Sequence, residues 1–111
     1  MKTDRELLEL AAKAAVIPYK ALPHSGSCWE KWDPLNDDGD ALRLAVALCF
    51  NVFPSKVWCT VRGGTKKAKS DTRFSIVEYY DWDDDYYTRD MAKGTRRAIT
   101  RAAAAIGEVK K

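Results

Sequence analysis

The sequence lacks the features that mark membrane, secreted and metal-binding proteins. No apolar run approaches the roughly 18 residues that a membrane-spanning helix needs, and the N-terminal residues carry charges in place of an apolar signal core. The three cysteines, Cys28, Cys49 and Cys59, form no Cys-x-x-Cys pair, so neither a zinc knuckle nor a disulfide framework is expected. We therefore expect a cytoplasmic protein without a cofactor or metal, in which Cys49 and Cys59 are buried as small apolar residues.

Groups that could carry catalysis are scarce as well. The single histidine, His24, has Cys28 nearby as a candidate thiol nucleophile, which makes a dyad a remote alternative. The acidic run at residues 81–85 supplies carboxylates but lacks the glycine and the terminal glutamate of a calcium-binding loop. We expect this run to pair with the basic segment Arg62–Lys69, in the same chain or in a neighbouring one. These absences favour a binding protein over an enzyme.

Length and charge set the scale of the molecule. With 111 residues, of which 46% are hydrophobic and 32% charged, the chain is long enough for one domain, residues 1–111, with a single core. The net charge of +3 is uneven, because residues 1–56 sum to −1 and residues 57–111 to +4. This balance is weaker than that of a dedicated duplex-DNA binder and suits a phosphate pocket. The apolar and aromatic content is large for so small a core, which predicts a homo-oligomer.

The apolar periodicity predicts helices at both ends of the chain. Thr3 and Glu6 form a capping box before a helix over residues 4–16, which must end before Pro18. A second helix is expected over 38–50, with an apolar face of Leu42, Ala45, Val46 and Cys49 that Leu44 and Leu48 widen. A last helix should end at Ile106 and be closed by Gly107. This last helix begins either at the pair Gly94 and Thr95 or near Asp90.

Between the helices the period changes to that of strands. Residues 56–61 and 73–80 are rich in β-branched and aromatic types, with Phe74, Ile76, Glu78 and Tyr80 on one side of the second segment. We expect an antiparallel sheet over about 52–80 and a core position for Trp58. The predicted class is α+β, an α-β-α sandwich with a small antiparallel sheet flanked by three helices.

Two segments carry a resemblance to a known family. One is Trp32–Leu48, which reads WDPLNDDGDALRLAVAL, and the other is Ala92–Ile106, which reads AKGTRRAITRAAAAI. With the alanine-rich first helix, they make the chain similar to the phage ABA-sandwich family, small bacteriophage and prophage accessory proteins of unknown function. The resemblance implies a three-layer α-β-α arrangement and a place in the cytoplasm of an infected bacterial host, and it implies no catalytic residue. Residues 23–31 and 62–69 depart from the family's compact pattern, so we regard them as candidates for a specific function.

One candidate ligand site lies at the predicted start of the last helix. If Thr95 caps that helix, its free amides and the neighbouring Arg96 and Arg97 form an anion site. The alternative is a solvated face that keeps the protein soluble. Aromatic side chains outside the expected core are either platforms for nucleobases or anchors at a protein interface. Besides Thr95, Arg96 and Arg97, the candidate ligand-binding residues are Trp32, Lys66, Lys67, Trp82, Tyr86 and Tyr87.

These traits lead to three hypotheses for the function. The first is a phage anti-defence protein that sequesters a small nucleotide immune signal, of the cyclic dinucleotide or ADP-ribose type, in a basic and aromatic pocket. The second is an interaction module that inhibits a host protein through its Trp and Tyr loops. The third is single-stranded nucleic-acid binding. The first two hypotheses differ in shape, because sequestration needs a concave site and an inhibitor of a protein needs an exposed patch.

Overall fold

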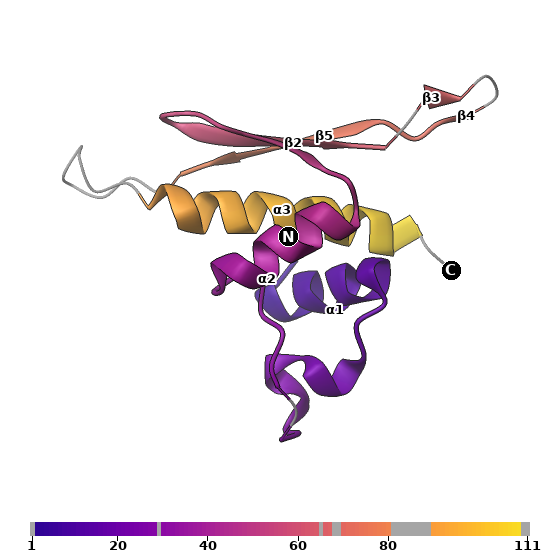
Figure 1. The fold of residues 1–111 in the computed structure, drawn as a ribbon, viewed down its shortest axis with the longest axis vertical. Helices are drawn as coiled ribbons and strands as arrows, with labels where there is room; N and C mark the ends of the chain where they lie inside the picture. The colour runs from indigo at the N-terminus through magenta and orange to yellow at the C-terminus, as the bar shows by residue number, and fades with distance from the viewer. Residues whose placement is uncertain (1, 29, 65, 68–69, 81–89, 110–111) are drawn as a thin grey trace.

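The computed structural model describes residues 2–28, 30–64, 66–67, 70–80 and 90–109, and it describes residues 66, 67, 70 and 71 by their backbone alone. The elements follow in the order α1 (Asp4–Ala15), two short 3₁₀ turns η1 (Tyr19–Ala21) and η2 (Pro23–Ser25), α2 (Asp38–Ala47), β1 (Asn51–Pro54), β2 (Trp58–Gly63), β3 (Lys66–Lys67), β4 (Ser70–Asp71), β5 (Phe74–Tyr79) and α3 (Met91–Val109). Strands β1, β2 and β5 form an antiparallel sheet in that order, while β3 and β4 form a separate two-stranded ribbon (Figure 1). The predicted α+β class with a small antiparallel sheet and three helices is confirmed.

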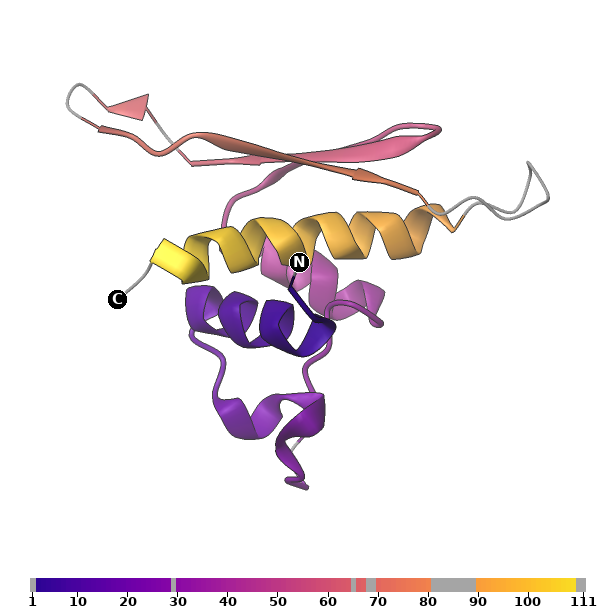
Figure 2. The ribbon, with the colours of Figure 1, turned by 180° about the vertical axis from the view of Figure 1, so that it is seen from behind.

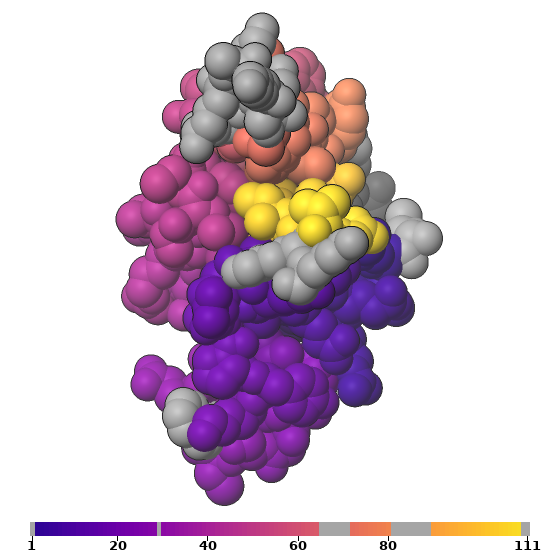
Figure 3. All heavy atoms as spheres, turned by 90° about the vertical axis from the view of Figure 1, so that its right-hand side faces the viewer, coloured from indigo at the N-terminus to yellow at the C-terminus, as the bar shows by residue number. Residues whose placement is uncertain are grey.

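Helix α3 lies in the middle of the molecule. The sheet covers one side of α3, and α1 and α2 pack against its other side (Figures 1 and 2). Seen from the end in Figure 3, the last turns of α3 lie between the strands and α1. The layers therefore run from sheet to α3 to α1 and α2, whereas the expected sandwich places helices on both faces of the sheet. Among the described elements, no helix covers the outer face of the sheet.

The first helix forms as the sequence predicts. The hydroxyl oxygen of Thr3 accepts a hydrogen bond from the Glu6 amide at 3.2 Å, and the Glu6 carboxylate accepts one from the Thr3 amide, which completes the capping box. The helix ends at Ala15 because Val16 adopts a left-handed conformation, with φ of 58°, two residues before Pro18. The buried face is Leu7, Leu8, Ala11, Ala12 and Ala14.

The core consists of two clusters joined by one tryptophan. The larger cluster combines residues of α1, α2, β2 and α3, among them Leu44, Cys59 and Val61. The smaller one lies between α1 and the following loop and is formed by Leu8, Ala12, Leu22 and Leu35. Trp32 is half-buried and packs against both clusters.

Several expectations about single residues are wrong. Helix α2 buries Ala41, Leu44 and Ala45 against α3, so Leu42 and Val46 on its other side are exposed. Cys49 is also exposed, because α2 ends at Ala47 and Cys49 turns the chain with a φ of 57°. Trp58 is exposed because side chains alternate along a strand and its neighbour Cys59 points into the core.

The start of α3 confirms the second of the two predicted alternatives, near Asp90, whereas its end differs from the expectation. The helix begins at Met91 and continues through Gly94 and Gly107 to Val109, so Gly107 does not close it. Both glycines instead permit close packing. A Cβ atom at Gly94 would overlap the ring of Tyr80, and one at Gly107 would overlap the backbone carbonyl of Leu10 in α1. In this helix the glycines mark contact points with its neighbours.

We predict that Gly107→Ala lowers the free energy of unfolding by about 1–3 kcal/mol, because overpacking against the α1 backbone outweighs the gain of about 1 kcal/mol in helix propensity. The measurement is urea denaturation followed by circular dichroism. The control is Val109→Ala, two residues on and exposed, which should change stability by less than about 0.5 kcal/mol. Equal stability of Gly107→Ala and the unmodified protein would contradict the close contact.

Candidate functional site

Arg96 joins α3 to the segment before α2. Its Nε donates a hydrogen bond to the Leu35 carbonyl at 3.0 Å, and its Nη1 lies 2.7 Å from the Asp38 carboxylate. The side chain is only 17% exposed. Arg96 therefore holds together the two segments on which the family resemblance rests, and its guanidinium is already bound within the chain.

Thr95 does not cap α3. The Asp90 carboxylate accepts a hydrogen bond from the Lys93 amide at 2.8 Å, which places the helix start four residues before Thr95. The Thr95 side chain acts on the Cys59 thiol of β2, whose pKa it lowers against the larger effect of burial. The predicted Thr95 cap is therefore wrong, because the first-turn amides of this helix follow Asp90, which already caps them.

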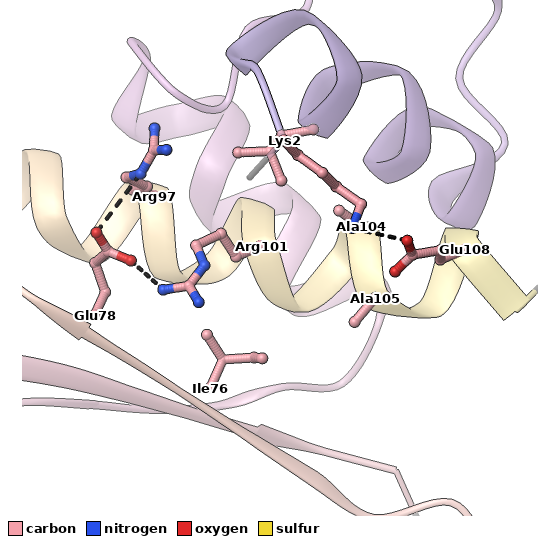
Figure 4. A pocket seen from close by; sticks show the side chains of 9 residues that line it. Lys2, Ile76, Glu78, Arg97, Arg101, Ala104, Ala105 and Glu108 are labelled. Atoms are coloured by element: carbon pink, nitrogen blue, oxygen red, sulfur yellow. Dashed lines mark hydrogen bonds and ion pairs between the residues drawn. The ribbon is translucent and has the colours of Figure 1, made fainter.

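Arg97 and Arg101 meet the carboxylate of Glu78 on β5. Arg97 lies 3.6 Å from Glu78 and 2.9 Å from Asp4, and Arg101 binds the other oxygen of Glu78 (Figure 4). Arg101 also donates to the Val77 carbonyl at 3.2 Å. Glu78, which faces the helices from the sheet, is thus shared by two arginines of successive turns of α3.

Two adjacent cavities open around this cluster. The larger, of about 450 Å³, lies between α1, α3 and β5 and includes an ion pair between Lys2 and Glu108 at 2.7 Å (Figure 4). The smaller, of about 320 Å³, shares Arg97 and Glu78 with it. Each cation at these walls has a carboxylate close by, either in an ion pair or in the same lining. The cavities are therefore charged but nearly balanced, which weakens their attraction for a phosphate.

The other candidate residues are placed only in part. Trp32 uses its ring for packing between the two core clusters, and its amide donates to the Ala21 carbonyl at 2.7 Å. Lys66 and Lys67 are described by their backbone in β3. Trp82, Tyr86, Tyr87 and the acidic run 81–85 lie outside the described residues. His24 bonds to Glu9 at 3.1 Å, so its described partner is a carboxylate rather than Cys28.

The outer face of the sheet is a feature that the sequence interpretation missed. Its large side chains are Phe53 (49% exposed), Trp58 (41%), Val77 (42%) and Tyr79 (67%). The ring centroids of Trp58 and Tyr79, which are register partners, lie 6.0 Å apart in an edge-to-face arrangement. Arg62 lies over Phe53, with its Cζ 5.4 Å from the ring centroid. The signal for this face is the alternation in β2, where Cys59 and Val61 take the inner positions and leave Trp58 outside.

The cysteines differ sharply in environment. Burial raises the pKa of the Cys59 thiol, although hydrogen bonds with the Thr95 side chain and the Phe53 backbone act in the opposite direction. Cys28 and Cys49 are exposed. Within the described ranges, no helix is long and apolar enough to cross a membrane, and no group of three His, Cys, Asp or Glu side chains is arranged to hold a metal ion.

We predict that two thiols of the folded protein react quickly with a disulfide reagent and that the third reacts only on unfolding, because the thiolate is the reactive form and Cys59 is buried with a raised pKa. Absorbance titration of the native and the urea-unfolded protein measures both stages. Cys59→Ala should abolish the slow stage alone. A third fast thiol in the native protein would contradict the burial of Cys59.

We also predict that Arg96→Ala lowers the free energy of unfolding by about 1–2 kcal/mol, because the Leu35 carbonyl loses its charged hydrogen-bond donor. The lost ion pair with Asp38 adds little, since Asp38 is exposed. Denaturation in urea tests this change. Arg43→Ala, which removes an arginine paired at the surface of α2, is the matched control and should leave stability nearly unchanged. If Arg96→Ala were as stable as this control, the structural role of Arg96 would be refuted.

Comparison with protein-family models, with curated proteins and with solved structures finds no match to this chain. Its function has to be inferred from its own surfaces.

Proposed function

We propose that this chain is a phage accessory protein that binds and inhibits a host protein, for instance one of the host's defences, through the outer face of its sheet. The observation that supports this proposal is the group of exposed side chains Phe53, Trp58, Val77 and Tyr79, with Arg62 beside them. Tryptophan, tyrosine and arginine are the residues that most often dominate the energy of protein interfaces. They are held here on strands, which fixes their positions before a partner arrives.

The shape of this surface favours a protein over a small nucleotide. The four side chains stand on neighbouring strands of one sheet face, in rows set by the pairing of Phe53 with Thr60 and of Trp58 with Tyr79. A small molecule binds tightly only where a concave site encloses most of its surface. The two cavities that contain Arg97 lie around Glu78, whose side chain points to the other side of the sheet. An exposed aromatic face is suited to a partner that has a matching surface of its own.

The position of the face also agrees with the parts of the sequence that depart from the family pattern. Trp32–Leu48 and Ala92–Ile106, which carry the resemblance, contribute to the core and to the Arg96 joint. The basic segment Arg62–Lys69 begins at the outer face, where Arg62 contacts Phe53. We therefore assign the segments of the resemblance to architecture and the outer face to a specific partner.

A photo-crosslinking amino acid at position 58 or 79 tests this proposal in bacterial cells that express the protein. We expect crosslinks to one defined host protein from these two positions and none from the exposed position 16, which lies after α1 on the other side of the molecule. With that partner purified, Trp58→Ala should weaken binding by about 2 kcal/mol or more, which is roughly 30-fold, in calorimetric titration.

The control for the titration is Val16→Ala, which truncates an exposed apolar residue away from the sheet. Equal crosslinking from positions 16 and 58 would contradict a specific face. Crosslinks from position 58 to nucleic acid alone would replace the protein partner by a single strand whose bases stack on the aromatic rings.

Sequestration of a nucleotide signal is a second candidate function, supported by the cavity of about 450 Å³ that contains Arg97 and Arg101. The Glu78 carboxylate there binds both guanidinium groups, in the manner of a phosphate. A nucleotide would have to displace this carboxylate.

Glu78→Gln therefore provides a test of the second candidate. If the cavity is a nucleotide site, this change should tighten the binding of cyclic dinucleotides or ADP-ribose by about tenfold, because it removes a competing negative charge, and Arg97→Ala should weaken it. Calorimetric titration of the three proteins measures both effects. Absence of heat from all three, with either ligand, would leave the protein partner as the remaining proposal.

A further inference from the structure

The two edges of the sheet are not equivalent, and among the described residues no strand pairs with the β5 edge. The Tyr80 amide donates to the Val57 carbonyl at 2.9 Å, which makes these two residues a hydrogen-bonded pair across β5 and β2. Because such pairs alternate along an antiparallel ladder, the backbone groups of Ser75, Val77 and Tyr79 point away from β2. The Arg101 side chain donates a hydrogen bond to the Val77 carbonyl, which agrees with a carbonyl that points away from β2.

The opposite edge is blocked by a proline. The Ser55 amide donates to the Trp58 carbonyl at 2.8 Å, so the backbone groups of Val52 and Pro54 are the ones that point away from β2. Pro54 has no N–H to offer, and prolines on edge strands are a common protection against further pairing. Strand β5, with six residues, has no proline. Only the β5 edge can continue the ladder over its full length.

The charges on either side of β5 indicate which strand fits this edge. The sequence that leads into β5 contains Arg62, Lys66, Lys67, Lys69 and Arg73, with Asp71 as its one acidic residue. The sequence that follows β5 contains four aspartates within residues 81–85. If two β5 strands pair antiparallel, the basic sequence before β5 of one copy is matched with the acidic sequence after β5 of the other. A parallel pair would bring like charges together.

We propose that the β5 edge binds the β5 edge of a second copy of this chain, antiparallel about a two-fold axis at Val77. Val77 then exchanges both backbone hydrogen bonds with its counterpart, and Ser75 pairs with Tyr79 of the other copy. The interface is isologous, so it closes at two chains and leaves only the β1 edges outside, which Pro54 protects. The two three-stranded sheets become one six-stranded sheet with a continuous outer face.

Nothing at the described edge prevents this pairing. The Arg101 contact uses one lone pair of the Val77 carbonyl and leaves the second for a backbone N–H. The side chains of Ser75, Val77 and Tyr79 stand on the outer face and do not lie across the edge. This dimer does not depend on the identity of the partner that binds the outer face.

Substitution at Val77 tests the pairing at its centre. Val77→Pro removes an N–H that makes no bond to β2, so the sheet within one chain is retained while the interface loses both central hydrogen bonds. We expect its dimer dissociation constant to rise by at least about tenfold in sedimentation equilibrium, with the monomer still folded by circular dichroism. Val77→Ala is the matched control, because it keeps the N–H and should remain dimeric. Trp58→Ala should also remain dimeric while losing the host partner.

Hydrogen exchange gives a second measurement that needs no substitution. The amides of Ser75, Val77 and Tyr79 should be protected in the concentrated protein and lose this protection together on dilution, and the Val52 amide on the β1 edge should exchange quickly throughout. High salt should shift the same transition to higher protein concentration. Fast exchange at all three β5 amides in a dimer, or a folded Val77→Pro protein that dimerises as tightly as the unmodified one, would overturn the proposal. A monomer at all concentrations would overturn it as well.

Discussion

The close approach of α3 to its neighbours is the constraint on which the rest of the structure depends. At one end of the helix the ring of Tyr80 fills the space that a side chain at Gly94 would occupy, and at the other end the α1 backbone fills the space beside Gly107. Between these two points the contact surface is mostly alanine, with Ala98, Ala102 and Ala103 fully buried. Small residues let backbones approach closely, so the three layers are thin and a few missing or added methyl groups decide whether they fit.

This arrangement explains why a largely buried arginine, Arg96, lies between α3 and the start of α2. Alanine contacts bury little apolar surface each, and the loop before α2 has a carbonyl, that of Leu35, which points at α3. Arg96 satisfies that carbonyl and reaches Asp38, the first residue of α2. The three aspartates that follow Pro34 make different contacts. Asp37 caps α2, Asp38 pairs with Arg96, and Asp40 accepts a hydrogen bond from the Asp33 amide. Each of these three aspartates therefore has a structural contact within the chain.

The sequence predicts the parts of this fold that follow from local rules. The capping box at Thr3, the end of α1 before Pro18 and the inward side of β5 from Phe74 to Tyr80 all depend on neighbouring residues, and all are confirmed. Such rules leave the start of α3 open between Asp90 and Gly94, because only tertiary packing shows that Gly94 makes room for Tyr80 inside the helix. Likewise, Arg96 and Arg97 appear as a basic pair in sequence, and only the folded chain brings Leu35, Asp38 and Glu78 against them. The exposed outer face could be predicted from the alternation of side chains in β2, because Trp58 points outward where Cys59 and Val61 point inward. The hydrophobic character of tryptophan favoured a core position instead.

The pairing of the first helix with the last also bears on how the chain folds. Helix α1 packs mainly against α3, and Asp4 bonds to Arg97, which is 93 residues away. A helix of 12 residues is marginal by itself in water, so α1 gains its stability only when the final segment of the chain arrives. During synthesis the alanine and leucine face of α1 therefore stays uncovered while the sheet residues are being made. Contacts so distant in sequence slow the search for the native state, and the strand edges that the finished molecule presents at its surface are then available to other nascent chains for a longer time.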